Sequence, residues 1–386
     1  MPWNESTRMD ERLAFVEAYS KGVYTMSELC RSAGVSRPTG YLWVARYRSH
    51  GEAGLHDRSH LVRHCPHRTP APIVERLLEL RQEHPFWGPR KLVVVARRRW
   101  PHVAWPSRST VALMLKREGL SAARRPRRRL LARAGTTART PQRPNGLWTF
   151  DFKGQFRTAD RRYCYPLTTT DLASRDLLQC VALRSTSAAP VQRHTDALMR
   201  EVGLPEAIHS DGGTPFAGPG IGHLTQLALH WLKLGIRLER SRPASPQDNA
   251  SHERMHRTLK QHTARPPAAT LAQQQRRFDR FRHEFNHERP HEALGDRTPA
   301  EFYRPSSTPF PERLPEVTYP GHYTLRRITH SGSLCWHSRR VFLSIVLARE
   351  TVGLIEVEDG VWSVYFAQHL LARLDEHVGK IIEVPV

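Results

Sequence analysis

From residue 147 the chain alternates short apolar runs with amphipathic stretches, and the order of these elements restricts the fold more than any other feature. LWTFDFKG, YCYPLTTTDL and DLLQCVAL are predicted to be three strands of an antiparallel meander. A helix at 186–203, the strand AIHSDGG, a helix at 222–235, the strand IRLERS and a helix from 245 follow. This order predicts an α/β domain over 147–305, with a mixed five-stranded sheet covered by helices.

The start of the last helix in this series is well marked. Ser245 can cap it, Pro246 occupies the first helical position, and Asp248 completes the spacing of a capping box. The helix is expected to continue through His262 and to carry Glu253.

Helical patterns fill the chain before residue 120. Within residues 1–60, Gly34 can make a tight turn and Ser36 can cap a second helix, which is the spacing of a helix-turn-helix unit. That second helix is expected to read a DNA groove. Its predicted contacts are Arg37, Thr39 and Arg46.

A second helical unit is predicted over residues 68–120, as a helix-turn-helix or winged-helix-like DNA-binding domain. Its first amphipathic helix ends at Pro85, and Gly119 marks the end of its last helix. Residues 121–146 then form a basic linker that contains no acid. It is too rich in Arg, Pro and Ala to build a core, but it can lie along a phosphate backbone.

The chain changes again after a proline-rich hinge at 306–319. Short strand patterns separated by turns follow in residues 320–386: YTLRRIT, SLCWH, RRVFLS, TVGLIEVEDG and VWSVYFA. We expect a small antiparallel β-barrel-like domain there.

The net charge points to a polyanionic partner. The 386 residues include 59 Lys plus Arg against 37 Asp plus Glu, a formal charge of +22. A Lys or Arg placed against a phosphate releases a condensed counterion, so a chain this basic favours nucleic acid. The five cysteines include no C-x-x-C pair, and no apolar run approaches the ~18 residues of a membrane helix. We expect a cytoplasmic, nucleoid-associated protein with no membrane segment.

Three carboxylates carry the expected chemistry. Asp151 lies inside an aromatic strand, Asp211 ends another strand, and Glu253 lies on the helix 41 residues further on. In the predicted fold they converge, and three converging acids repel one another unless hard cations such as Mg²⁺ or Mn²⁺ neutralise them. Two such ions can activate an attacking oxygen and stabilise a leaving one at phosphorus. Lys260, two turns beyond Glu253, is expected to hold a phosphate on the same face, and Arg257 is a further predicted DNA contact.

Several motifs together resemble one family. WTFDFKG, SDGGTPF, LGIRLERSRPASPQDNASHERMHRTLK and FNHERPHEALGDRTPAEFY look like the integrase-type core of bacterial insertion-sequence transposases, which are kin to retroviral integrases. The resemblance implies an RNase H-like fold and a D-D-E triad at Asp151, Asp211 and Glu253 that holds two Mg²⁺ ions. It also implies strand cleavage and strand transfer on terminal inverted repeats and target DNA, by a homo-oligomer.

One position departs from the family pattern. Members usually have Asn-Gly after the second Asp, where this chain has Gly212-Gly213. The missing amide can loosen the loop that orients Asp211, although it removes no metal ligand. A catalytically weak or inactive DNA-binding regulator therefore remains an alternative.

A second alternative is a zinc protease. His252, Glu253 and His256 match H-E-x-x-H, and His262 falls where a third ligand can lie. The turn-making glycine of that motif is replaced by Leu259, so the helix is expected to carry His262 away. Other polar residues have simpler interpretations: His283, His287 and His291 as surface groups, Asp171 and Asp176 as turn caps, and Trp148 with the aromatics at 86–87 and 100–105 as core.

Overall fold

The structure is a computed structural model that describes residues 7–57, 68–121, 141–240 and 250–382. It divides into two compact units, Met1–Thr69 and Pro70–Val386, and each is described by itself. Most of the predicted basic linker, and the predicted helix-start residues Ser245, Pro246 and Asp248, lie outside the described residues. Among the described residues, no helix is both long enough and apolar enough to span a bilayer.

The first unit is a three-helix bundle. It contains α1 (Arg8–Ser20), α2 (Met26–Ser32) and α3 (Arg37–His50), followed by a short 3-10 helix (Gly51–Leu55). The Ser36 side chain accepts a hydrogen bond from the Thr39 N–H and caps α3, as predicted. Gly34 has φ +65°, a conformation that favours glycine in the turn between α2 and α3. A Cβ at Gly40 would lie 2.7 Å from Cys30 Sγ, so only glycine permits this close packing of α2 and α3.

The second unit begins with three more helices. These are α4 (Ala71–Glu83), α5 (Pro89–Arg99) and α6 (Arg108–Arg117). Leu77, Leu92 and Val111 are fully buried in their shared core. Trp87 and Trp105 are 1% and 8% exposed and are core residues, as the sequence predicted. Phe86 was also predicted to be a core residue, but it is 49% exposed, so that prediction was wrong.

A mixed sheet follows. Its strands are β1 (Trp148–Phe152), β2 (Phe156–Arg157), β3 (Tyr163–Asp171), β4 (Leu177–Leu183), β5 (Ala207–Ser210) and β6 (Arg237–Arg240). β1 pairs antiparallel with β3, which pairs antiparallel with β4. On its other edge β1 pairs parallel with β5, which pairs parallel with β6. The five predicted strands are therefore present in a mixed sheet, and the two-residue β2 adds a sixth.

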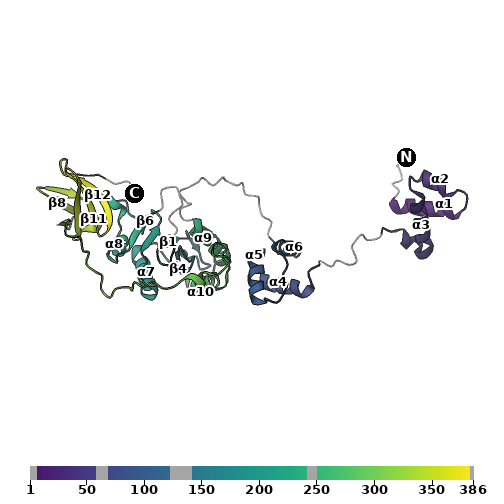
Figure 1. Cartoon of the computed structure of the whole chain (residues 1–386), viewed down its shortest axis with the longest axis horizontal. Helices are drawn as coiled ribbons and strands as arrows, with labels where there is room; N and C mark the ends of the chain where they lie inside the picture. The colour runs from purple at the N-terminus through teal and green to yellow at the C-terminus, as the bar shows by residue number, and fades with distance from the viewer. Residues whose placement is uncertain (1–6, 58–67, 122–140, 241–249, 383–386) are drawn as a thin grey trace. The chain divides into compact units, whose positions relative to one another are not determined.

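Helices cover both faces of this sheet (Figure 1). α7 (Ala188–Val202) and α8 (Gln226–Lys233) pack on one face through a cluster that includes Phe150 and Trp231. α9 (Ala250–Thr263) and α10 (Leu271–His283) pack on the other through Met255, Leu259 and Phe278. The chain continues as a π-helix (Glu284–Glu288), a 3-10 helix (Glu292–Leu294) and α11 (Pro299–Phe302).

The C-terminal region is an open antiparallel sheet rather than a closed barrel. Its strands are β7 (Thr324–Arg327), β10 (Thr351–Glu358), β11 (Val361–Phe366), β12 (His369–Asp375) and β13 (Lys380–Ile382), beside the hairpin of β8 (Ser333–Trp336) and β9 (Arg339–Phe342). The order is β13-β12-β11-β10-β7, and among the described strands β7 and β13 do not pair with each other. The predicted barrel is therefore not confirmed, because closure requires its two edge strands to pair.

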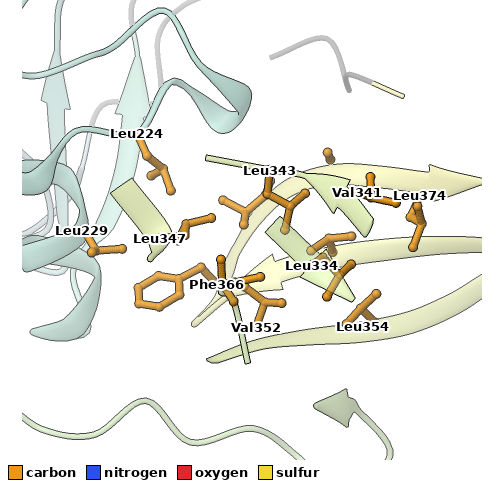
Figure 2. Close-up of a cluster of buried hydrophobic side chains, with 14 of the residues drawn as sticks. Leu224, Leu229, Leu334, Val341, Leu343, Leu347, Val352, Leu354, Phe366 and Leu374 are labelled. Carbon is orange, nitrogen blue, oxygen red and sulfur yellow. The ribbon is translucent and has the colours of Figure 1, made fainter. Parts of the chain in front are cut away.

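This sheet shares a hydrophobic core with α8. Leu224 and Leu229 belong to the same buried cluster as Leu347 and Phe366. Figure 2 shows the leucines of the teal ribbon facing Phe366 and Leu347 from the C-terminal strands. The C-terminal sheet is thus packed directly against the α/β region.

Candidate active site

The alternation of side chains along β1 selects which residues face α9. Phe150 packs with Trp231 of α8 on one face of the sheet. Thr149 and Asp151 point to the opposite face, where Thr149 Oγ1 lies 2.7 Å from His252 Nδ1. The aromatic neighbours that bury β1 therefore also direct the Asp151 carboxylate toward α9.

Asp211 reaches the same place through parallel pairing. Phe150 of β1 is opposite Ser210 of β5, so the next residue on each strand is an aspartate. Asp211 is exposed, and its Oδ1 accepts a hydrogen bond from the Gly213 N–H at 3.3 Å. A Cβ on Gly212 would meet no atom within 4 Å, so this loop has room for a side chain at that position.

Glu253 is the third acid. It lies in the first turn of α9 and is exposed, between the buried side chains of His252 and Met255. Its charge acts on Asp151, as does that of Asp211. The structure therefore brings Asp211 and Glu253 within electrostatic reach of Asp151.

The Asp151 carboxyl group has a strongly perturbed pKa. Burial is the largest cause, and together with the charges of Asp211 and Glu253 it raises the pKa of Asp151 to about 7. A hydrogen bond from the Phe152 backbone and the charge of Lys153 act in the opposite direction. Within the described residues no Lys or Arg forms an ion pair with any of the three acids, so the negative charge at this point has little internal compensation.

Threonine and histidine side chains form a network of contacts around Asp151. Thr168 Oγ1 donates to the Asp151 carbonyl oxygen at 3.0 Å. Thr168 Oγ1 also lies 2.7 Å from His252 Nε2 and 2.6 Å from His256 Nε2. A hydroxyl has one proton and two lone pairs, so Thr168 accepts from both rings, and each ring carries its proton on Nε2.

His256 Nδ1 therefore carries no proton and can only accept a hydrogen bond. It lies 3.5 Å from Asp151 Oδ2. Burial, followed by the charges of His252 and Lys153, lowers the pKa of His256 well below its ordinary value, so the ring is neutral. A neutral acceptor facing a carboxyl oxygen favours the protonated form of Asp151 when no cation is bound, in agreement with the raised pKa of that group.

The same geometry argues against the zinc-protease alternative. Asp151, His252 and His256 offer ligand atoms within 4.8 Å of one another, but both nitrogens of His252 already contact threonine hydroxyls. His262 lies 3.6 Å from Glu284 and packs on Phe281 instead. The H-E-x-x-H match therefore arises from two buried structural histidines that flank an exposed glutamate.

The predicted DNA contacts of the first unit differ in their surroundings. Arg37 is exposed in the first turn of α3. Thr39 is half-buried, and its hydroxyl contacts Ser36 Oγ at 2.8 Å, so it belongs to the helix cap. Arg46 is half-buried, with its guanidinium 4.8 Å from the ring centre of Trp43.

On α9, Arg257 and Lys260 are exposed, as a DNA contact requires. The sequence did not single out Tyr41, which is 54% exposed on α3. His291 was predicted to be a surface group, whereas that ring is half-buried and contacts the Phe285 carbonyl at 3.3 Å. Asp171 does cap its turn, accepting from the Ser174 N–H at 2.7 Å.

Comparison with protein families gives the identity of this architecture. Two integrase core domain models match residues 141–246 and 234–299. A helix-turn-helix domain model matches residues 11–61, and a homeodomain-like domain model matches 39–115. The chain carries an integrase core of the bacterial insertion-sequence transposase type. An integrase core is a polynucleotidyl transferase domain, so the chain is an enzyme of that class.

Two relatives come from bacterial insertion elements, and both are described as uncharacterized. The integrase-core chain is 25% identical over 232 residues to a 31.7 kDa protein of insertion element IS407 from Burkholderia multivorans, covering 60% of this chain and 80% of the relative. It is 29% identical over 248 residues to a 39.2 kDa protein of insertion element IS476 from Xanthomonas euvesicatoria, covering 62% and 67%. The predicted resemblance is confirmed.

Among solved structures, the chain is similar to one from the simian T-cell lymphotropic virus intasome in complex with PP2A regulatory subunit B56 gamma. The identity is 16%, the match covers 80% of this chain and 100% of that chain, and the TM-score is 0.38. A TM-score this low supports no inference about the present protein.

Proposed function

We propose that the chain is a DNA transposase that cleaves and rejoins strands at the ends of an insertion sequence, with Asp151, Asp211 and Glu253 as its catalytic acids. The observation that carries the proposal is the convergence of these acids: parallel pairing of β1 with β5 brings Asp211 beside Asp151, and the charges of Asp211 and Glu253 both act on Asp151. A buried carboxyl group whose pKa is raised by neighbouring acids is typical of a site that binds cations.

The donor set fits Mg²⁺ or Mn²⁺. All three groups offer hard carboxylate oxygens, Asp211 and Glu253 are exposed to incoming ions, and the histidines beside them are engaged by threonines. Two bound ions would polarise the attacking and leaving oxygens of an in-line displacement at phosphorus.

The chain's own residues supply position and charge. The Thr168 hydroxyl fixes the backbone at Asp151, and His256 limits where its carboxyl group can turn. Lys260 and Arg257, exposed on α9, would hold strand phosphates near the acids. In this proposal residues 1–60 and 68–120 bind double-stranded DNA, including the terminal inverted repeats, and 147–305 perform the chemistry in a homo-oligomer.

The test is metal-dependent nicking of DNA that carries the element's ends. The parent protein should nick with Mg²⁺ or Mn²⁺ and not with EDTA. Glu253→Gln should lose nicking while its affinity for the same DNA in EDTA stays unchanged. Glu201→Gln, which removes an exposed charge on α7, is the matched control and should nick as the parent does.

Two outcomes would contradict the proposal. If Glu253→Gln nicks as fast as Glu201→Gln, the triad assignment is wrong. If the parent binds the ends tightly but never nicks them with either metal, the chain acts as a DNA-binding regulator instead.

A further inference from the structure

A cavity of about 450 Å³ lies between α9, the segment 285–293 and α5, away from the three acids. On α9 it is lined by Ser251, Arg254, Met255 and Thr258, whose i, i+3, i+4, i+7 spacing marks one face of the helix. Glu253 projects from a different face of α9. The cavity is therefore separate from the candidate active site.

Its lining is strongly cationic. Lys91, Arg175, Arg254 and Arg289 all line the cavity. Burial, and next the charge of Arg289, lower the pKa of Lys91 to about 8. Burial and the charge of Arg254 lower the pKa of Arg175. These positive groups are thus close enough to repel one another.

The two acids in the lining offset only part of this charge: Asp171 acts on Arg175, and Glu292 acts on Lys91. The Asp171 carboxylate accepts hydrogen bonds from the backbone N–H groups of Asn145 and Ser174, each at 2.7 Å. Glu292 pairs with Arg90, which is not one of the residues that line the cavity.

The arginines that line the cavity have N–H donors that are available to a ligand. In the part of the chain that the structure describes, the guanidinium groups of Arg175, Arg254 and Arg289 have no hydrogen bond or ion pair. Arg289 Nη1 is fully buried without a hydrogen-bond partner. A buried donor without a partner is costly, and a ligand that accepts its hydrogen bond would remove that cost.

We propose that this cavity binds a phosphate group. Planar guanidinium groups donate in pairs to phosphate oxygens, and three of them with a lysine match the charge and the acceptor geometry of one phosphate. Under the proposed function the phosphate belongs to a DNA strand that crosses α9 about one helix width, ~10 Å, from the acids. The other source of the same chemistry is free inorganic phosphate.

The test measures binding of duplex DNA by the full-length protein in EDTA, as a function of salt. Removing one phosphate contact should reduce the slope of log affinity against log salt by about one unit. Arg254→Ala should show this reduction, and Arg254→Glu a larger loss of affinity. Arg276→Ala and Arg276→Glu, at an exposed arginine of α10 outside the cavity, are matched controls and should leave the slope unchanged.

A thermal shift with inorganic phosphate distinguishes the two sources. If phosphate raises the melting temperature of the parent but not of Arg254→Glu, and the DNA slopes are equal, the site takes free phosphate. If the Arg254 variants match their Arg276 controls in both measurements, the proposal is wrong. Circular dichroism of Arg254→Ala checks that this exposed substitution leaves the fold intact.

A negative result for the phosphate site can be distinguished from a negative result for the proposed function. Nicking by the parent and its loss in Glu253→Gln test the acids and do not depend on the cavity. A protein that nicks normally while its Arg254 variants behave as controls would retain its catalytic assignment and lose only the phosphate site.

Discussion

The indole Nε1 of Trp87 donates a hydrogen bond to the Glu284 carboxylate at 2.8 Å. His84, stacked on the same indole at 3.6 Å, lies 3.5 Å from this carboxylate, and His262 of α9 lies 3.6 Å from it. One glutamate therefore joins the helices of 71–117 to both α9 and the π-helix of the α/β region.

Replacing Glu284 by Ala should destabilise the protein. It would leave the buried Trp87 N–H without a partner, at a cost of roughly 1–3 kcal/mol. Glu288→Ala is the control, because Glu288 is exposed and contacts histidines only at 3.8 and 3.9 Å. Urea unfolding at pH 6.5 measures both, and equal midpoints for the two variants would contradict the assigned role of Glu284.

The contribution of Glu284 should depend on pH. Burial acts to raise its pKa, but hydrogen bonds from His262 and His84 outweigh this and lower the pKa to about 2. A depressed carboxyl pKa stabilises the fold above the unfolded value of 4.5, and the stabilisation disappears as the pH falls through the folded value. The difference between the parent and Glu284→Ala should therefore shrink as the pH is lowered from about 5 toward 2. A difference that grows over this range would refute the argument.

Thr168→Val tests the contacts that the Thr168 hydroxyl makes with the Asp151 backbone and the two histidines. Valine has nearly the same shape, but it would leave the Nε2–H groups of His252 and His256 without their acceptor, at a cost of about 2–4 kcal/mol. The rate of nicking should fall together with the stability. Thr169→Val is the neighbouring control on the opposite face of β3, where the hydroxyl has only a 3.5 Å contact to Gln179, and it should cost less than ~1 kcal/mol. Equal unfolding free energies for the two variants would argue against the shared hydroxyl.

Gly212→Asn restores the residue that the family resemblance implies. No atom lies within 4 Å of a Cβ there, so stability should stay within ~1 kcal/mol of the parent, with a gain from reduced freedom of the unfolded chain. We expect faster nicking, because an amide can order the loop that holds Asp211. Gly353→Asn is the contrast: its Cβ would lie 2.6 Å from Tyr319, and the variant should be strongly destabilised. Slower nicking by Gly212→Asn would contradict the expectation.

Phe366→Ala tests the core shared by α8 and the C-terminal sheet. Phe366 is fully buried, so the loss should be about 3–5 kcal/mol in free energy of unfolding. Phe342→Ala, at a side chain that is 61% exposed, should change it by less than ~0.5 kcal/mol. Chemical denaturation of both variants gives the comparison, and a mild effect at Phe366 would mean that the two layers are not tightly packed.

Local signals in the sequence predicted local structure well. The Ser36 cap, the Gly34 turn and the strand that contains Asp151 are each determined by residues within a few positions, and all are present. The aromatic neighbours of Asp151 also predicted a buried strand, and β1 is buried from Trp148 to Phe150. The strands of Asp151 and Asp211 were predicted to be neighbours, and β1 does pair with β5.

Contacts between distant segments could not be predicted in the same way. His252 contacts Thr149 and Thr168, 103 and 84 residues earlier, and nothing near any of these residues marks the pairing. The C-terminal pattern suggested a barrel because short antiparallel strands are common to barrels and open sheets, and only the pairing of the edges separates the two. β12 and β13 were not anticipated, because HLLARLD lacks a clear alternation and KII is very short.

The shared core of α8 and the C-terminal strands has a practical consequence for anyone who expresses a fragment of this chain. Ending the protein at the proline-rich segment would leave the outward leucines of α8 facing water, and such a fragment should aggregate. A minimal catalytic fragment therefore has to keep the strands up to residue 382, and exchanging C-terminal segments between relatives requires the matching α8 surface to be exchanged as well.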